Sequence, residues 1–151
     1  MDVYGIIFRL VAYIFFGIVM EVLVSSVTTV GRCGWNAETK KMFGSVSIFM
    51  ALVYGPCLLF IYEPIRLLLL PFNSWIQFLA YGLAFTTFEF IAGLFFDKVC
   101  RIKLWDYSTC DDSIMGYTRT ALFFQWGFCG IMLSSYSGFI IYLSQFIGKY
   151  F

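Results

Sequence analysis

Four long apolar runs constrain this chain more than any other feature of its sequence. They cover approximately residues 6–30, 44–70, 74–96 and 119–147. A helix needs about 20 residues to cross roughly 30 Å of hydrocarbon, and each run is long enough. The runs do not alternate apolar and polar residues, as the strands of a membrane barrel would. The sequence therefore predicts an all-α, polytopic membrane protein whose four transmembrane helices form a single domain over residues 1–151.

Composition excludes several classes of function. Charged residues make up 13% of the chain and hydrophobic residues 61%, whereas about 25% charged is ordinary for soluble proteins. Histidine is absent, which rules out a Ser-His-Asp triad and His-ligated zinc or haem. The five cysteines form no C-x-x-C pair, and a net charge of +1 argues against a nucleic-acid partner, which needs a basic face to neutralise its phosphates. We expect no metal, cofactor, nucleotide or nucleic acid.

Two halves of the chain match in order, which suggests an internal repeat. "AYIFFGIVME" and "AYGLAFTTFE" share Ala-Tyr and end on Glu21 and Glu89. "FGSVSIFMALVYGPC" and "MGYTRTALFFQWGFC" match at Gly44/Gly116, Ala51-Leu52/Ala121-Leu122, Tyr54/Trp126, Gly55/Gly127 and Cys57/Cys129. The pattern predicts a duplicated helical hairpin, with repeats at approximately 6–70 and 74–147. Such hairpins would be related by a pseudo-twofold axis along the membrane normal.

Glu21 and Glu89 are the residues that this axis should bring face to face. An ionisable group inside a span costs several kcal/mol, roughly 3 or more, so it usually points inward with a partner. Two such carboxyl groups at close range cannot both ionise cheaply, and at least one should be protonated. With Gln125 they form our candidate intramembrane polar site. It could be structural, could bind an ion, proton or lipid headgroup, or could act as an acid/base pair.

The distribution of cations predicts the orientation of the chain. Seven of the ten Lys and Arg residues lie in or beside the loops 31–43 and 97–118, which places these loops in the cytosol. The membrane would be the endoplasmic reticulum or another endomembrane in a eukaryote, and the inner membrane in a bacterium. Glu63 and Arg66 are three residues apart near the opposite boundary, which predicts an interfacial ion pair.

The second loop carries "WDYS", residues 105–108, directly after a basic run. Trp105 and Tyr107 are typical of the membrane interface. Asp106 and Ser108 can each bond backbone amides and start a turn. This composition predicts an ordered interfacial loop cap.

Several of these motifs resemble those of a known family. "FFGIVMEVLVSS", "ALVYGPCLLFIYE", and "FEFIAG" followed by "WDYS" and "MGY" are similar to the transmembrane protein 229 family of animals and to related bacterial ABC-transporter type IV (CmpB-like) membrane proteins. The resemblance covers most of residues 10–135 and implies four spans with conserved acidic and W-D-Y-S elements, but no established activity. The matching positions are Glu21, Gly55, Glu89, Gly93, Trp105, Asp106, Tyr107, Ser108, Gly116 and Trp126.

The resemblance also bears on mechanism. The animal proteins often carry His before the glutamate of the first helix, where this chain has Phe16-Gly17, so a mechanism that needs His is disfavoured. We expect the W-D-Y-S loop to fold back over the loop-side end of the bundle and close a cavity above Glu21 and Glu89.

These observations favour a non-enzymatic integral membrane bundle that is a subunit or lipid-handling component of a larger membrane complex. Its expected partners are membrane lipids and other transmembrane subunits. One alternative is a permease for a small solute or ion that uses the glutamate pair. Another is an intramembrane lipid-modifying enzyme that uses the glutamates and Asp106 as acid/base groups.

Overall fold

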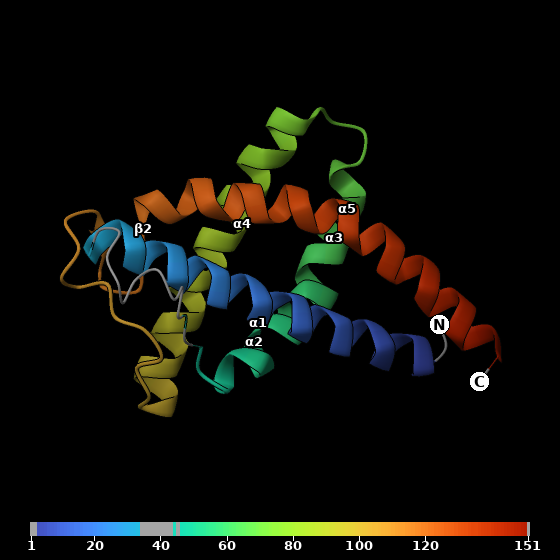
Figure 1. The fold of residues 1–151 in the computed structure, drawn as a ribbon, viewed down its shortest axis with the longest axis horizontal. Coiled ribbons are helices and arrows are strands. Elements are labelled where there is room, and N and C mark those ends of the chain that lie inside the picture. The colour runs from blue at the N-terminus through green and yellow to red at the C-terminus, as the bar shows by residue number, and fades with distance from the viewer. Residues whose placement is uncertain (1–2, 34–43, 45, 151) are drawn as a thin grey trace. The chain divides into compact units, whose positions relative to one another are not determined.

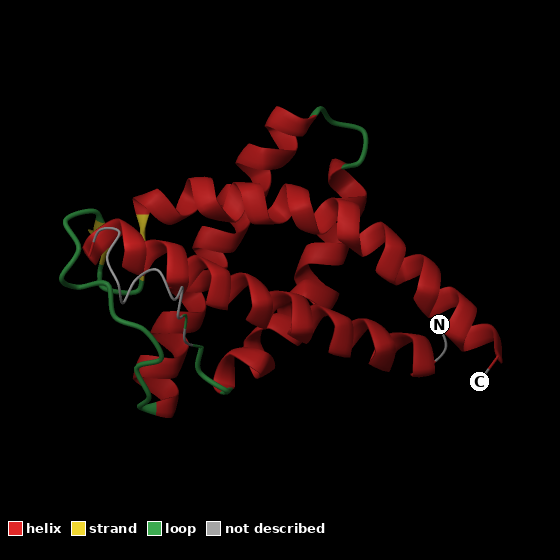
Figure 2. Ribbon diagram, in the orientation of Figure 1, coloured by secondary structure: helices red, strands yellow, loops and turns green. Residues whose placement is uncertain are grey.

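The fold is almost entirely helical (Figures 1 and 2). The computed structural model describes residues 3–33, 44 and 46–150, with the side chains of 27–33 left out, so residues 34–43 of the first predicted loop lie outside the described part. The elements are α1 (Val3–Cys33), α2 (Phe49–Cys57), the π-helical η2 (Leu58–Tyr62), α3 (Glu63–Leu69), α4 (Ser74–Phe95), the π-helical η3 (Phe96–Cys100), β1 (Ser113–Ile114), β2 (Thr118–Arg119) and α5 (Thr120–Tyr150).

In the residues that the structure describes, four helical segments are long and apolar enough to cross a membrane, which confirms the predicted all-α fold with four spans. They are Val3–Ser26, Phe49–Leu69, Ser74–Cys100 and Thr120–Tyr150. The only pairing of strands in the described residues is the two-residue antiparallel ladder of β1 with β2. The third span runs further than the apolar run predicts, because η3 extends it to Cys100. It ends at Arg101, whose left-handed φ of 59° stops the helix.

The described chain divides into two compact units, Met1–Glu63 with Ile140–Phe151, and Pro64–Phe139. In the first unit, glycines bring α1 against α2. A Cβ on Gly17 would lie 2.4 Å from the ring of Tyr54, and one on Gly55 would lie 2.7 Å from Ile14. Pro56 lies inside α2 and has no N–H to donate, and the chain continues from Cys57 as the π-helical turn η2.

In the second unit, α4 packs on the first part of α5. Asn73 caps α4, because its side-chain oxygen accepts a hydrogen bond of 3.0 Å from the amide of Ile76. The helices approach closely at Gly82 on α4 and at Gly127 and Gly130 on α5. Side chains fill the space on either side of these contacts, with Tyr81 and Leu133 both 1% exposed. Close helix contact through small residues is the usual packing mode in membranes.

Adding one methyl group tests this close approach. A Cβ on Gly130 would lie 2.4 Å from Tyr81, so Gly130→Ala should destabilise the protein by about 1 to 3 kcal/mol. Gly138→Ala on the same helix is the matched control, because a Cβ there would meet only the terminal nitrogen of the flexible Arg66 side chain, at 3.5 Å. This control should be neutral or slightly stabilising, since alanine favours a helix. Unfolding in mixed micelles measures both. Equal effects would contradict close packing at Gly130.

Candidate functional site

The most elaborate polar cluster surrounds Glu89, which lies on α4 and is 9% exposed. Thr118 Oγ1 donates to Glu89 Oε2 at 2.6 Å, and Trp126 Nε1 donates to the same oxygen at 3.2 Å. Tyr107 hydroxyl donates to Oε1 at 3.1 Å. An indole N–H can only donate, so Oε2 is an acceptor here. Three hydrogen-bond donors therefore converge on this one carboxyl group.

The loop between η3 and α5 is anchored beside Glu89 by its aromatic residues. Trp105 Nε1 donates to the carbonyl of Tyr117 at 2.7 Å, and the indole lies against Gly93, where a Cβ would be 3.2 Å from the ring. The hydroxyl of Tyr117 donates to Asp97 at 2.7 Å. Because Gly93 carries no side chain, α4 leaves room for the indole. The loop is therefore ordered against α4.

Asp106 and Ser108 shape the loop rather than contact Glu89. Asp106 Oδ1 accepts from the amide of Ser108 at 2.9 Å, and Oδ2 pairs with Lys103 Nζ at 2.7 Å. The amide of Tyr107 donates to the carbonyl of Gly116, whose φ of 81° suits glycine. The Lys103 ammonium, followed by the Ser108 hydroxyl and amide, holds the pKa of Asp106 below its ordinary 3.8, and Asp106 raises the pKa of Lys103.

Asp112 organises the start of α5. Its Oδ1 accepts from Arg119 Nε at 2.7 Å, and its Oδ2 accepts from the amide of Ala121 at 2.9 Å. The hydrogen bond from this amide, followed by that from Arg119, keeps the pKa of Asp112 below its ordinary value. Asp112 thus supplies an acceptor for a backbone amide in the first turn of α5, where amides have no partner within the helix.

The low pKa of Asp106 gives a pH dependence with a defined sign. A lowered pKa in the folded state contributes stability above the ordinary pKa, and this contribution is lost as the pH falls toward the folded value. We expect Asp106→Ala to lower the protection of the Ser108 amide against hydrogen exchange at pH 5 to 7. Below pH 3.8 the difference from the unmodified protein should shrink. Asp111→Ala, which removes an exposed carboxylate of the same loop, is the control. A difference that disappears near pH 6, or an equal effect of Asp111→Ala, would contradict this role.

Glu21 is held within its own hairpin by one aromatic hydroxyl. It lies on α1 and accepts a hydrogen bond from Tyr54 on α2. Four and five positions further along α1, Ser25 and Ser26 each donate a hydrogen bond to the carbonyl of Val22. Glu21 and Glu89 belong to different units, and their predicted meeting stays a prediction. Gln125 lies half-buried on α5 and makes none of the described hydrogen bonds to Glu89, whereas the adjacent Trp126 does.

A third carboxylate, Glu63, forms an ion pair inside the first unit. Its Oε2 accepts from Arg9 Nη1, and its Oε1 accepts from the Tyr13 hydroxyl at 2.7 Å. The Arg9 and Glu63 side chains are 8% and 14% exposed. The structure therefore pairs Glu63 with Arg9 and Tyr13, whereas helical spacing predicted an ion pair of Glu63 with Arg66. Spacing compares only residues on one helix, whereas Arg9 and Tyr13 come from α1, about 50 positions away.

Sequence reasoning missed three of these polar partners. Arg9 and Tyr13 lie in the first apolar run, and Thr118 immediately follows "MGY". Tyr13 is part of the matched "AY" pair, and this repeat was the signal that could have singled it out. The described residues hold no group of three His, Cys, Asp or Glu that could bind a metal.

These observations define a class: an α-helical membrane protein with four spans in its described part, whose embedded carboxylates are bonded by donors from its own helices and from the segment that precedes α5. A comparison with protein families makes the assignment more specific. The family described as "Putative ABC-transporter type IV" matches residues 8–150, and the chain belongs to this family. No curated protein and no solved structure matched the chain. The likeness to transmembrane protein 229 remains a resemblance.

Proposed function

We propose that the protein is a non-enzymatic subunit of a larger membrane assembly that serves transport. The observation that carries this proposal is that the embedded carboxylates are bonded to side chains of the protein itself. Glu21, Glu63 and Glu89 each accept hydrogen bonds from aromatic, hydroxyl or guanidinium donors of their own unit. Bonds of this kind hold helices together. The family description, which names a transporter type, supports the link to transport.

The outward faces of the helices supply a surface for other helices or lipid. On α1 the exposed apolar residues recur every four positions: Val3, Ile7, Val11, Phe15, Val19 and Leu23. On α4 the exposed apolar residues include Leu79, Leu83, Ile91 and Phe95, and on the first part of α5 they include Phe124, Phe128 and Met132. A contiguous apolar face in a membrane protein contacts acyl chains or partner helices.

The two hairpins are copies of one ancestral unit in this proposal. Three contacts between matched positions support it. Tyr54 donates to Glu21 as Trp126 donates to Glu89. Gly55 faces Leu10 and Ile14, and its match Gly127 faces Phe78, which is the match of Leu10. Gly17 faces the Tyr54 ring, and its match Phe85 meets Trp126 edge to face at 6.0 Å. Each hairpin would then be stabilised by the same polar and small-residue positions.

The orientation and the membrane are also part of the proposal. We infer that the loop with Lys103 and Arg101 lies in the cytosol, because cations concentrate on that side. The membrane would be an endomembrane or a bacterial inner membrane. The permease and the lipid-modifying enzyme remain alternatives. The permease predicts flux and the enzyme predicts lipid turnover, whereas a non-enzymatic subunit by itself has neither activity.

Gentle purification from the native membrane, followed by native mass measurement, tests the subunit role. We expect a complex of fixed stoichiometry with another transmembrane protein. Phe15→Asn and Leu83→Asn place the same polar amide on the outer faces of α1 and α4, respectively. One of them should dissociate the complex while the other serves as its control. Recovery of a monomer alone, or flux through the purified chain by itself, would contradict the proposal.

A further inference from the structure

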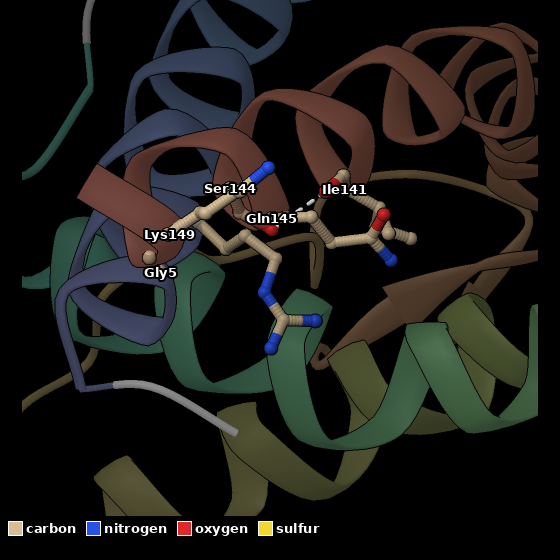
Figure 3. A pocket seen from close by; sticks show the side chains of 7 residues that line it. Gly5, Ile141, Ser144, Gln145 and Lys149 are labelled. Atoms are coloured by element: carbon tan, nitrogen blue, oxygen red, sulfur yellow. Dashed lines mark hydrogen bonds between the residues drawn. The ribbon is translucent and has the colours of Figure 1, made fainter.

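A pocket of about 320 Å³ lies in the first unit between the beginning of α1 and the end of α5. It is lined by Gly5, Arg9, Ile141, Ser144, Gln145, Gly148 and Lys149 (Figure 3). The two helices meet closely beside it, since a Cβ on Gly5 would lie 2.9 Å from the carbonyl oxygen of Ser144.

The residues that line the pocket offer several hydrogen-bond donors and include no carboxylate. Arg9 and Lys149 are cationic, and Gln145 adds a side-chain amide. The buried Ser144 hydroxyl is bonded to the carbonyl of Ile141 at 2.7 Å, so it helps to shape the wall. Glu63 neutralises one of the two cations through its ion pair with Arg9. The lining side chains together with Glu63 therefore carry a net charge of +1, which comes from Lys149.

The pocket lies at the ends of two spans. Lys149 is the penultimate residue of α5, and Arg9 lies six residues into α1, or about 9 Å along the helix axis. Long cationic side chains at such positions reach toward the headgroups while their stems stay in the apolar layer. Below them the wall includes the aliphatic side chain of Ile141. The cationic donors therefore lie where a lipid headgroup would lie, and the apolar wall lies where its acyl chains would lie.

We propose that this pocket binds a negatively charged phosphate group, with Lys149 and Gln145 as its donors and Arg9 at its base. The phosphate could belong to the headgroup of an anionic phospholipid or be free in solution. The pocket is defined by one unit of the chain, so this inference is independent of whether the protein is a subunit.

Lipid retention tests the proposal. The full chain is purified in mild detergent, incubated with equal amounts of phosphatidylglycerol and phosphatidylcholine, and analysed by native mass spectrometry. We expect retained phosphatidylglycerol to exceed phosphatidylcholine. Lys149→Gln should lower the retention of phosphatidylglycerol about three- to fivefold, which is the effect of one cation at an anionic surface. Lys149→Glu should lower it further. Lys103→Gln removes one exposed lysine from the other unit and is the matched control.

A second arm separates the two sources of phosphate. Inorganic phosphate is added to delipidated protein, and thermal unfolding is measured with chloride at equal ionic strength as the reference. Stabilisation that Lys149→Gln abolishes, without selective lipid retention, assigns the pocket to free phosphate. Selective lipid retention assigns it to a headgroup. The proposal is overturned if both phospholipids are retained equally and phosphate does not stabilise the protein, or if Lys149→Gln and Lys103→Gln have equal effects.

Discussion

Replacing Glu89 by alanine should destabilise the protein by about 3 to 5 kcal/mol. The change leaves Thr118, Tyr107 and Trp126 without the acceptor that they share. Each buried donor without a partner costs about 1 to 3 kcal/mol, and donors in one network are not additive. Thr118 bears the largest share, because it is 1% exposed and bonds at 2.6 Å. The free energy of unfolding in mixed micelles measures the loss.

Glu89→Gln is the matched control for this variant. The amide keeps one oxygen that can accept from Thr118 and Trp126, and its nitrogen can donate to Tyr107, whose hydroxyl is able to reverse its role. We expect a cost of about 1 to 2 kcal/mol, because the amide offers one acceptor oxygen where the carboxyl group offers two, and the bond with Tyr107 must reverse. If Glu89→Ala unfolds at the same denaturant concentration as the unmodified protein, Glu89 does not hold the loop and α5 together.

The second large effect concerns Arg9. Arg9→Met should cost about 3 to 5 kcal/mol, because Glu63 then keeps a carboxylate inside a span without its cation. The double variant Arg9→Met/Glu63→Leu removes both charges and should recover most of this loss. Its remaining cost, about 1 to 2 kcal/mol, comes from Tyr13, which is fully buried and loses its acceptor Glu63.

Unfolding of the two single variants and the double variant distinguishes pairing from simple loss of packing. Restoration by the second substitution means that the charges depend on each other. A double variant whose loss equals the sum of the two single losses would show that Arg9 and Glu63 act independently. Arg66→Met provides a further control, because it removes the cation that is closest to Glu63 in the sequence.

The apolar runs were sufficient to predict the fold class, because a 20-residue span has few solutions in a bilayer. The same argument cannot locate helix ends that depend on single residues. The third span runs to Cys100 because the backbone reverses only at Arg101. A residue other than glycine that adopts the left-handed backbone conformation cannot be recognised from composition.

The candidate site was predicted less completely. Hydropathy identifies Glu21 and Glu89 because an embedded carboxylate is rare, and motif resemblance adds Trp105 and Tyr107. Their partners depend on which helix faces which, and periodicity within a single helix does not contain that information. Glu63 illustrates this limit, since spacing suggests Arg66 and the structure pairs it with Arg9. The matched positions of the two hairpins are more informative, because they single out Tyr54 and Trp126.

The central claim is that each matched hairpin holds its glutamate with an aromatic donor on the following span. Double-mutant cycles of Glu21→Ala with Tyr54→Phe, and of Glu89→Ala with Trp126→Phe, test it through the free energy of unfolding, because each substitution removes one partner of the hydrogen bond. The account predicts a coupling energy of about 1 to 2 kcal/mol in both cycles. Additive effects in either cycle, within about 0.5 kcal/mol, would contradict it.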